Sequence, residues 1–140
     1  MLAAPHAPLH GGPFMSCFVR IATKLTDETT LRLAAVELGY KVQEKAGVVK
    51  GWGDDEAHAD VVINTGTAYD VGAVRNKSET FDFVGDFSMA HLSETDFVNR
   101  MSQAYGKIRV VEAAKKSGFV VASQSVDRQG AVQLVLRRFT

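Results

Sequence analysis

The chain has 140 residues, 46% of them hydrophobic and 23% charged, and its formal net charge is zero. These values are typical of one soluble globular domain. The zero net charge argues against a nucleic-acid-binding protein, and so does the sequence pattern, because the basic residues are not interleaved with aromatic ones. The apolar runs are too short to cross a bilayer. A single cysteine, Cys17, excludes an internal disulfide, and we predict that it is a small buried residue on a strand.

The N-terminal segment MLAAPHAPLHGGPF carries no charge and is rich in Ala, Pro and Gly. This composition favours neither a helix nor a central strand, so we predict a surface arm over residues 1–14 and a single α+β domain over residues 15–140. The absence of acidic residues also fits the remnant of an organelle-targeting segment. His6 and His10 are separated by a proline, which excludes a helical pair of metal ligands.

A strand and a helix are expected next. Residues 16–25 alternate apolar and polar side chains, which predicts a half-buried strand. Thr26 or Asp27 is the expected N-cap of a helix that ends at Gly39. Its core-facing residues fall at helical spacing: Leu31, Ala34, Ala35 and Leu38.

The central third of the chain predicts several strands. Residues 41–49 read as a strand interrupted by Gly47, and residues 50–58 as a loop. Trp52 on this loop is either folded back onto the core or an exposed anchor for a partner. His58 follows an acidic run, and a solvated loop position is favoured over cation binding.

A hairpin is predicted from residues 59–64 and 69–75, joined by a short linker that contains Gly66. Asp60 and Asp70 then lie near the far ends of the paired strands. A general acid needs an apolar pocket that raises its pKa, and nothing in the pattern builds one, so we interpret both carboxylates as solvated sheet residues.

Residues 80–87 predict a further strand, with three phenylalanines on one side and Asp82, Val84 and Asp86 on the other. A long helix follows. Ser93 is its expected N-cap with Asp96 three residues later, and Leu92 and Phe97 fit a hydrophobic staple. His91 precedes this cap and is interpreted as positional. One apolar stripe runs along the helix: Phe97, Met101, Ala104, Ile108 and Val111.

Ser117 and Gly118 end this helix after about 24 residues. The chain then predicts a hairpin of residues 119–126 and 131–139, with Val132, Leu134 and Leu136 facing inward. The whole order predicts an α+β fold: an antiparallel sheet of about six to seven strands with two helices on one face, in a ferredoxin-like core with added strands.

Charge is polarised along the chain. Residues 51–99 hold ten acidic and two basic residues, a net charge of −8, whereas residues 100–140 hold eight basic and two acidic residues, a net charge of +6. Such polarity could give the protein one face of each sign for a charged partner. Pairing of the two groups across the sheet is the equal alternative.

No motif in the sequence predicts catalysis. The glycines of GVVKGWG match neither a phosphate-binding loop nor a dinucleotide fingerprint, and no serine or cysteine has a histidine nearby in sequence. We therefore expect a protein that is not an enzyme and that carries no catalytic residue, metal or cofactor.

Several segments together resemble a known family: MSCF followed by TKLTD, LGY at residues 38–40 followed by VQE, ADVVI followed by YDVG, FVNRMSQAYG, and GAVQLVLRRF. From about Met15 to Phe139 the chain is similar to the family of hypothetical chloroplast reading frame thirty-five, of red-lineage plastids and cyanobacteria. This chain differs from that family at two places. Members of the family carry histidine at the position of Cys17, and they have an aromatic end where this chain has Phe139 and Thr140.

The resemblance implies a stromal plastid protein, peripheral to the thylakoid and associated with photosynthesis. We expect a non-catalytic accessory or assembly protein that docks on the stromal side of a photosynthetic membrane complex, with photosystem I subunits as the first candidates, without direct membrane insertion. The alternatives are a small-molecule-binding or enzymatic α+β domain and a soluble adaptor for an ATPase. The predicted partner-binding residues are Lys107, Arg109, Lys115, Lys116, Arg137, Arg138 and Trp52.

Overall fold

The computed structural model describes residues 18–138. The elements in chain order are β1 (Phe18–Ala22), α1 (Glu28–Glu37), β2 (Lys41–Val42), β3 (Gly47–Lys50), β4 (Glu56–Ala59), β5 (Val61–Asn64), β6 (Val71–Arg75), β7 (Phe81–Asp86), α2 (Glu94–Lys116), β8 (Phe119–Val126) and β9 (Val132–Arg138). The arm expected over residues 1–14, the strand position expected for Cys17, and the histidines of the N-terminal segment lie outside the described residues.

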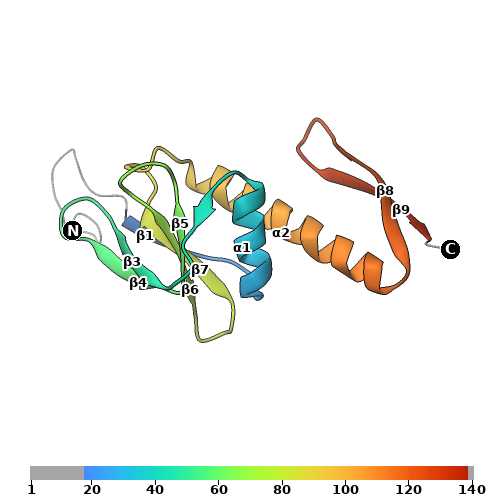
Figure 1. The fold of residues 1–140 in the computed structure, drawn as a ribbon. Coiled ribbons are helices and arrows are strands. Elements are labelled where there is room, and N and C mark those ends of the chain that lie inside the picture. The colour runs from blue at the N-terminus through green and yellow to red at the C-terminus, as the bar shows by residue number, and fades with distance from the viewer. Residues whose placement is uncertain (1–17, 139–140) are drawn as a thin grey trace.

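The main sheet has five antiparallel strands in the order β1-β7-β6-β5-β2. The strands β5, β6 and β7 form a meander, and α1 connects β1 at one edge to β2 at the other (Figure 1). Buried side chains of both helices share one core cluster with the same face of this sheet. The expected α+β class and the packing of both helices on one face are therefore confirmed.

The strand count and order differ from the expected single sheet of six to seven strands. The segment 41–49 divides into β2, which joins the main sheet, and β3, which pairs with β4. The expected strand 59–64 also divides, because β4 ends at Ala59 and β5 begins at Val61. At the break, the Asp60 N–H donates to the Ala73 carbonyl and its carboxylate accepts from the Arg75 N–H, at 2.9 and 2.8 Å. These two hydrogen bonds hold the chain at the bend between β4 and β5. Beyond the bend, β4 pairs with β3 in a separate sheet.

The ferredoxin-like topology is likewise corrected. That order needs a strand after the second helix to return to the main sheet, whereas β8 and β9 pair only with each other among the described residues. Because β1 then keeps its place at the sheet edge, its outer side has no neighbouring strand within residues 18–138.

The larger core lies between the sheet and the helices. Phe81, Phe83 and Phe87 point to this side, as their alternation predicted, and all are at most 1% exposed. Phe97 of α2 meets Phe83 and Phe87 edge to face, with ring centroids 5.1 and 5.5 Å apart. Tyr40 adds a tilted contact at 5.7 Å. Edge-to-face geometry of this kind adds to the stabilisation from burial alone.

A smaller core lies on the other face, where β3 and β4 cover the sheet. Val49, Ala59 and Val62 are its buried members. Gly72 of β6 makes the close approach possible, because a Cβ there would lie 2.6 Å from the Ala59 Cβ and 2.8 Å from the Val49 Cγ2. The polar side of β7 is therefore covered by a second layer that its alternation did not predict.

The predicted helix ends are confirmed. Asp27 caps α1 by accepting from the Thr30 N–H at 2.9 Å, and Gly39 adopts a φ of 95° just after the helix. Ser93 caps α2 by accepting from the Asp96 N–H at 3.2 Å. The α2 helix has 23 residues, close to the expected length.

Candidate partner-binding surfaces

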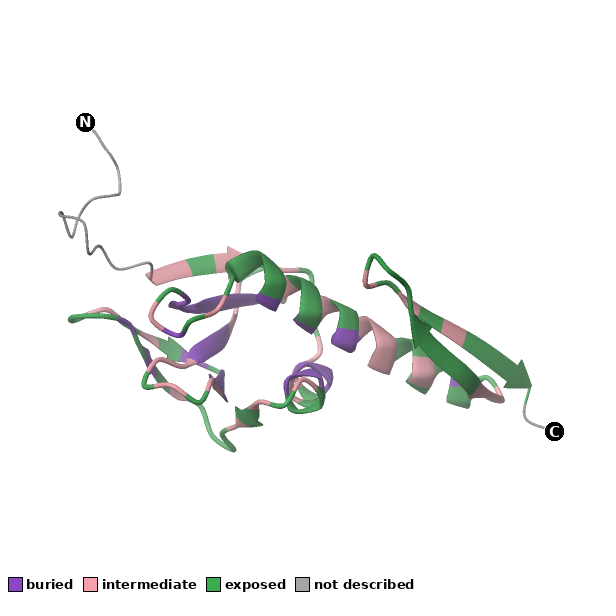
Figure 2. Cartoon of the chain, turned by 90° about the horizontal axis from the view of Figure 1, so that it is seen from above, coloured by how far each residue is buried: buried purple, intermediate pink, exposed green. Residues whose placement is uncertain are grey.

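The second half of α2 extends beyond the sheet (Figures 1 and 2). Its buried residues are concentrated in the first half: Phe97, Met101, Ala104 and Tyr105, followed only by Ala114. The predicted apolar stripe is thus core as far as Ala104, whereas Ile108, at the margin of the core, and Val111 are only partly buried. The helix carries the C-terminal hairpin away from the body.

None of the residues 119–138 is buried (Figure 2). The expectation that Val132, Leu134 and Leu136 face into the core is therefore wrong: the first two are half-buried and Leu136 is 39% exposed. The physical reason is that β8–β9 packs beside α2 as a separate two-stranded sheet and does not join the main sheet. We call residues 109–138, the second half of α2 with this hairpin, the C-terminal arm.

The hairpin register gathers apolar side chains on one face. Directly opposite residues of an antiparallel pair share a face, and Val121 lies opposite Leu136, while Val126 lies opposite Val132. Alternation along β9 adds Leu134 to the same face. Phe119 is paired with Arg138 at its base. An isolated two-stranded sheet is marginally stable in water, so this hairpin face is a surface that a further partner can cover.

The C-terminal arm is also basic. It holds six basic residues against Glu112 and Asp127, a net charge of +4, and the basic side chains are exposed: Arg109, Lys115, Lys116, Arg128, Arg137 and Arg138. The Arg138 guanidinium lies over the Phe119 ring, 4.8 Å from its centroid. The apolar hairpin face is therefore bordered by cations.

The structure divides the predicted partner-binding residues into three groups. Five of them are exposed residues of the C-terminal arm: Arg109, Lys115, Lys116, Arg137 and Arg138. The other two predicted residues do not join them.

Lys107 precedes the arm and forms an ion pair with Glu37 of α1, with Nζ 2.5 Å from Oε2. Its side chain is only 20% exposed, so it links the two helices instead of extending the basic surface. Trp52 lies between β3 and β4, at the opposite end of the body from the arm (Figure 1). A single surface that contains all seven predicted residues therefore does not form.

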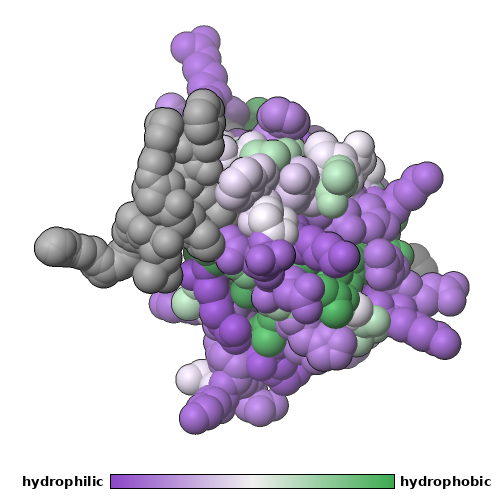
Figure 3. Space-filling view, turned by 90° about the vertical axis from the view of Figure 1, so that its left-hand side faces the viewer, coloured by the Kyte–Doolittle hydropathy of each residue, from purple (hydrophilic) through white to green (hydrophobic). Residues whose placement is uncertain are grey.

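Trp52 is 46% exposed, which favours the exposed anchor over the buried alternative. Its backbone N–H donates to the Asp86 carboxylate at 3.2 Å, and that carboxylate also accepts from the Met89 N–H at 3.1 Å. Asp86 is completely buried, and sequence alternation did not indicate this role. Viewed from this end, the body presents a mainly hydrophilic surface with a limited hydrophobic area (Figure 3).

The mid-chain carboxylates do not form a pair. In the β5–β6 ladder Val61 lies opposite Ala73 and Ile63 opposite Val71, so Asp60 and Asp70 flank opposite ends of it. Their expected positions are thus confirmed. Among the described residues, no group of three His, Cys, Asp or Glu side chains is arranged to hold a metal ion.

Asp82, on the face that β3–β4 covers, is a structural carboxylate. Burial raises its pKa, but hydrogen bonds from the Arg20 Nε at 2.7 Å and the Asn76 Nδ2 at 2.8 Å outweigh this effect, so the pKa lies below its usual value. This carboxylate is charged at neutral pH and joins β1, β7 and the turn after β6.

Two other polar residues have structural positions that the sequence did not predict. His58 lies on β4 instead of a loop, with Nδ1 3.2 Å from the Gly47 carbonyl oxygen of β3. The Tyr105 hydroxyl of α2 accepts from the Asp27 N–H at 2.9 Å. Burial raises the Tyr105 pKa, but hydrogen bonds with Thr26 and Asp27 outweigh this effect, so the pKa lies below its usual value. Tyr105 thus fixes the start of α1 against α2.

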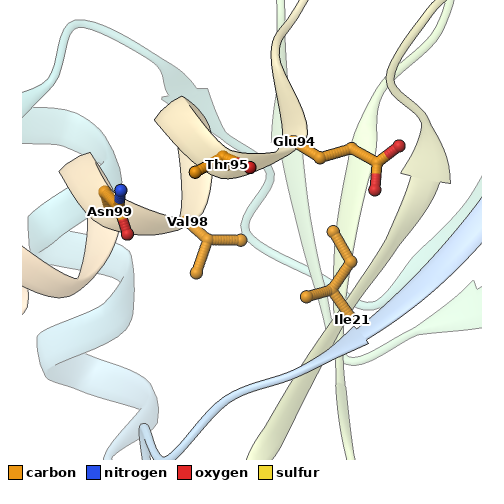
Figure 4. A pocket seen from close by; sticks show the side chains of 5 residues that line it. All are labelled: Ile21, Glu94, Thr95, Val98 and Asn99. Atoms are coloured by element: carbon orange, nitrogen blue, oxygen red, sulfur yellow. The ribbon is translucent and has the colours of Figure 1, made fainter.

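Two hollows formed by residues of the described range 18–138 are candidate ligand sites. One, of about 240 Å³, is formed by Ile21 of β1 and the first turns of α2, where Val98 lies near Ile21 and the Glu94 carboxylate stands at the rim (Figure 4). The other, of about 350 Å³, lies where Tyr40 and Lys41 meet the loop after β5. A pocket lined by Tyr40, Trp52 and Tyr69 together would favour the small-molecule alternative. Only Tyr40 of these three residues lines this hollow.

These features define a small α+β protein with a two-sided sheet, a projecting basic arm and no helix among residues 18–138 long and apolar enough to cross a membrane. Residues 34–135 match the family described as "Protein of unknown function (DUF1257)", and the chain belongs to that family.

Three curated relatives, all named "Uncharacterized protein ycf35", cover 89% of this chain and 98% of their own length. The protein of Guillardia theta is 32% identical over 127 residues, that of Pyropia yezoensis 25% over 127, and that of Cyanophora paradoxa 23% over 128. This confirms the family resemblance, and the name, that of a hypothetical chloroplast reading frame, supports a plastid association. No solved structure matches the chain.

Proposed function

We propose that the protein is a non-catalytic accessory or assembly protein that docks on the stromal side of a photosynthetic membrane complex, with photosystem I as the first candidate. The observation that carries the proposal is the C-terminal arm, whose apolar hairpin face is bordered by exposed cations and contains no buried residue. The plastid association of the relatives supports the compartment.

The chemistry of the arm specifies the partner surface. Val126 and Leu136, which share the hairpin face, are 66% and 39% exposed and offer an apolar centre. The surrounding Lys and Arg residues call for acidic groups at the rim of the partner, where charge accelerates association and selects orientation. The partner is therefore a protein surface with an apolar patch enclosed by carboxylates.

Charge reversal on the arm tests this docking. Lys115 and Lys116 are exposed, and the double substitution Lys115→Glu/Lys116→Glu should reduce co-purification with thylakoid complexes in mild detergent at least tenfold, or about 1.4 kcal/mol. The loss should be larger at low salt, where screening is weaker. Lys24→Glu/Lys45→Glu, with the same change in charge at two exposed positions of the body, is the matched control.

If the protein docks in this way, the native protein should sediment with thylakoid membranes. It should also co-purify with photosystem I subunits after gentle solubilisation. Recovery of the native protein solely in the soluble stroma would contradict it. Equal losses for the arm and body variants would show that net charge, and not the arm, controls the association.

A small-molecule-binding or enzymatic role is the second candidate, and the hollow beside Tyr40 favours it because Lys41, Asn64 and Thr65 give it polar lining. A metabolite that co-purifies with the recombinant protein and is lost in Asn64→Leu would support this role. An adaptor for a soluble ATPase, the remaining alternative, predicts recovery of an ATPase in place of photosystem subunits in the same purification.

A further inference from the structure

Within residues 18–138, the outer side of β1 has no neighbouring strand at Arg20 and Ala22. The Thr23 N–H donates to the Phe81 carbonyl at 3.2 Å, at the end of the β1–β7 ladder. Bonding residues alternate along an antiparallel strand, so Ile21 also bonds toward β7, whereas the N–H and C=O groups of Arg20 and Ala22 point outward. Among residues 18–138 no strand lies on that side. Such an edge is a template for the addition of another strand.

The hollow beside this edge specifies the side chains of the added strand. It lies on the helix side of β1, where Ile21 and Val98 provide apolar walls and the Glu94 carboxylate stands at the rim (Figure 4). Asp96 adds a second carboxylate in the first turn of α2. The complementary strand carries an aliphatic side chain followed two residues later, on the same face, by a cation.

Strand β9 of this chain has that pattern. Leu134, Leu136 and Arg138 share one face of it, and β9 has β8 as its single neighbour, so its outer edge is open within the described residues. The Asp127 N–H bonds to the Ala131 carbonyl, and alternation from this pair directs the Leu134 N–H toward the open edge.

Charge complementarity favours a second copy of this chain as the source of that strand. The arm carries a net charge of +4, whereas residues 51–99, which include β7 and the start of α2, carry −8. Face-to-face pairing of two arms would instead bring two cationic surfaces together. An arm on the body of another copy joins opposite charges and covers part of the apolar hairpin face.

We propose that β9 of one copy adds to the outer edge of β1 of a second copy at Arg20 and Ala22, with Leu136 in the hollow against Ile21 and Val98 and Arg138 beside Glu94. The contact is heterologous, so it gives a dimer if the arms are exchanged reciprocally and longer assemblies if they are not. This self-association is a second interaction of the arm, in addition to docking on a membrane complex. It would cover part of the apolar hairpin face when the membrane complex is absent.

The test is the mass of the full-length protein in solution, measured by light scattering or sedimentation between about 5 and 500 µM. The mass should rise above the 15.2 kDa of the monomer with concentration and should fall with added salt. A protein that stays monomeric over this range at low salt overturns the proposal.

Ala22→Pro tests the edge itself. Proline removes an N–H that points away from β7, so the β1–β7 ladder is preserved while strand addition is blocked. Association should weaken at least tenfold, or about 1.4 kcal/mol, with an unchanged circular dichroism spectrum. Association equal to that of the wild type would overturn the proposal, because the edge would then be unused.

A charge swap covers the case in which Ala22→Pro fails to fold. Arg138→Glu and Glu94→Lys should each weaken association, and the double variant should recover it. Absence of recovery contradicts the pairing. The result is separable from that of membrane docking, because Ala22→Pro leaves the arm intact and should still co-purify with thylakoid complexes.

Discussion

The body and the C-terminal arm use similar apolar side chains in different surroundings. In the body, both faces of the main sheet meet another layer: Phe83 and Phe87 meet the helices, and Val62 meets β3–β4. In the arm, Val132, Leu134 and Leu136 alternate just as regularly, but none of them is buried. Apolar alternation therefore identifies a face that needs cover, and the topology determines whether the same chain supplies it.

This contrast separates the residues that hold the fold from those that are free to bind. A side chain that is already buried contributes to stability and is removed from recognition. An apolar side chain that stays exposed in a contiguous group is typical of an interaction site. The predictions below test whether the division between body and arm is as sharp as the burial suggests.

The largest expected effect is in the helix-side core. Phe83→Ala removes a fully buried ring that meets Phe97 edge to face, and it should lower the free energy of unfolding by about 3–5 kcal/mol. Leu136→Ala in the arm should cost less than about 1 kcal/mol, because 39% of that residue is already exposed. Urea unfolding of both variants measures the contrast. Similar losses would mean that the arm belongs to the cooperative core.

The next effect tests the second layer of the body. Gly72→Ala places a Cβ 2.6 Å from the Ala59 Cβ, so β3–β4 must shift, and the free energy of unfolding should fall by about 1–3 kcal/mol. Gly106→Ala is the control, since a Cβ at that helical position meets no atom within 4 Å. It should stabilise α2 by up to about 1 kcal/mol. Opposite signs in thermal unfolding are the expected outcome.

The local elements of the body could be predicted from the sequence because local chemistry determines them. The caps at Asp27 and Ser93 and the alternation of Phe81 with Asp82 require only near neighbours. The division of the chain at Asp60 could not be predicted, because Val61 continues the alternation of Ala59 and the break depends on bonds to Arg75, fifteen residues later. The small residue Gly72 was the available signal for a layer on that face.

The candidate site could be predicted only in part, for the same reason. The basic residues of the arm were found by their charge, but Lys107 is paired with Glu37, a contact that sequence order does not reveal. The exposure of Leu136 was missed because its alternation is that of a core strand. Its exposure depends on the tertiary arrangement of the hairpin, and this exposure makes it a candidate binding residue.

A smaller effect concerns the acid stability of the body. The pKa of Asp82 is lower in the folded than in the unfolded chain, so its contribution to stability is present above the unfolded value and is lost as the pH falls through the folded one. We expect a loss of stability below about pH 4, and the 53% exposure of Arg20 reduces its size. Asp82→Asn should be less stable at pH 7 and should lack this part of the acid-induced decline in urea unfolding experiments.

The smallest effect on stability should accompany the clearest effect on binding. Val126 is 66% exposed at the tip of the hairpin, so Val126→Ser should change the free energy of unfolding by no more than about 0.5 kcal/mol. The same substitution removes apolar area from the hairpin face and should weaken co-purification with the membrane complex severalfold. Val48, which is 45% exposed on β3, offers a matched control in Val48→Ser. If both substitutions leave binding unchanged, the hairpin face is not the docking surface. If both weaken binding equally, exposed apolar area contributes to binding at either position, and the division between body and arm fails.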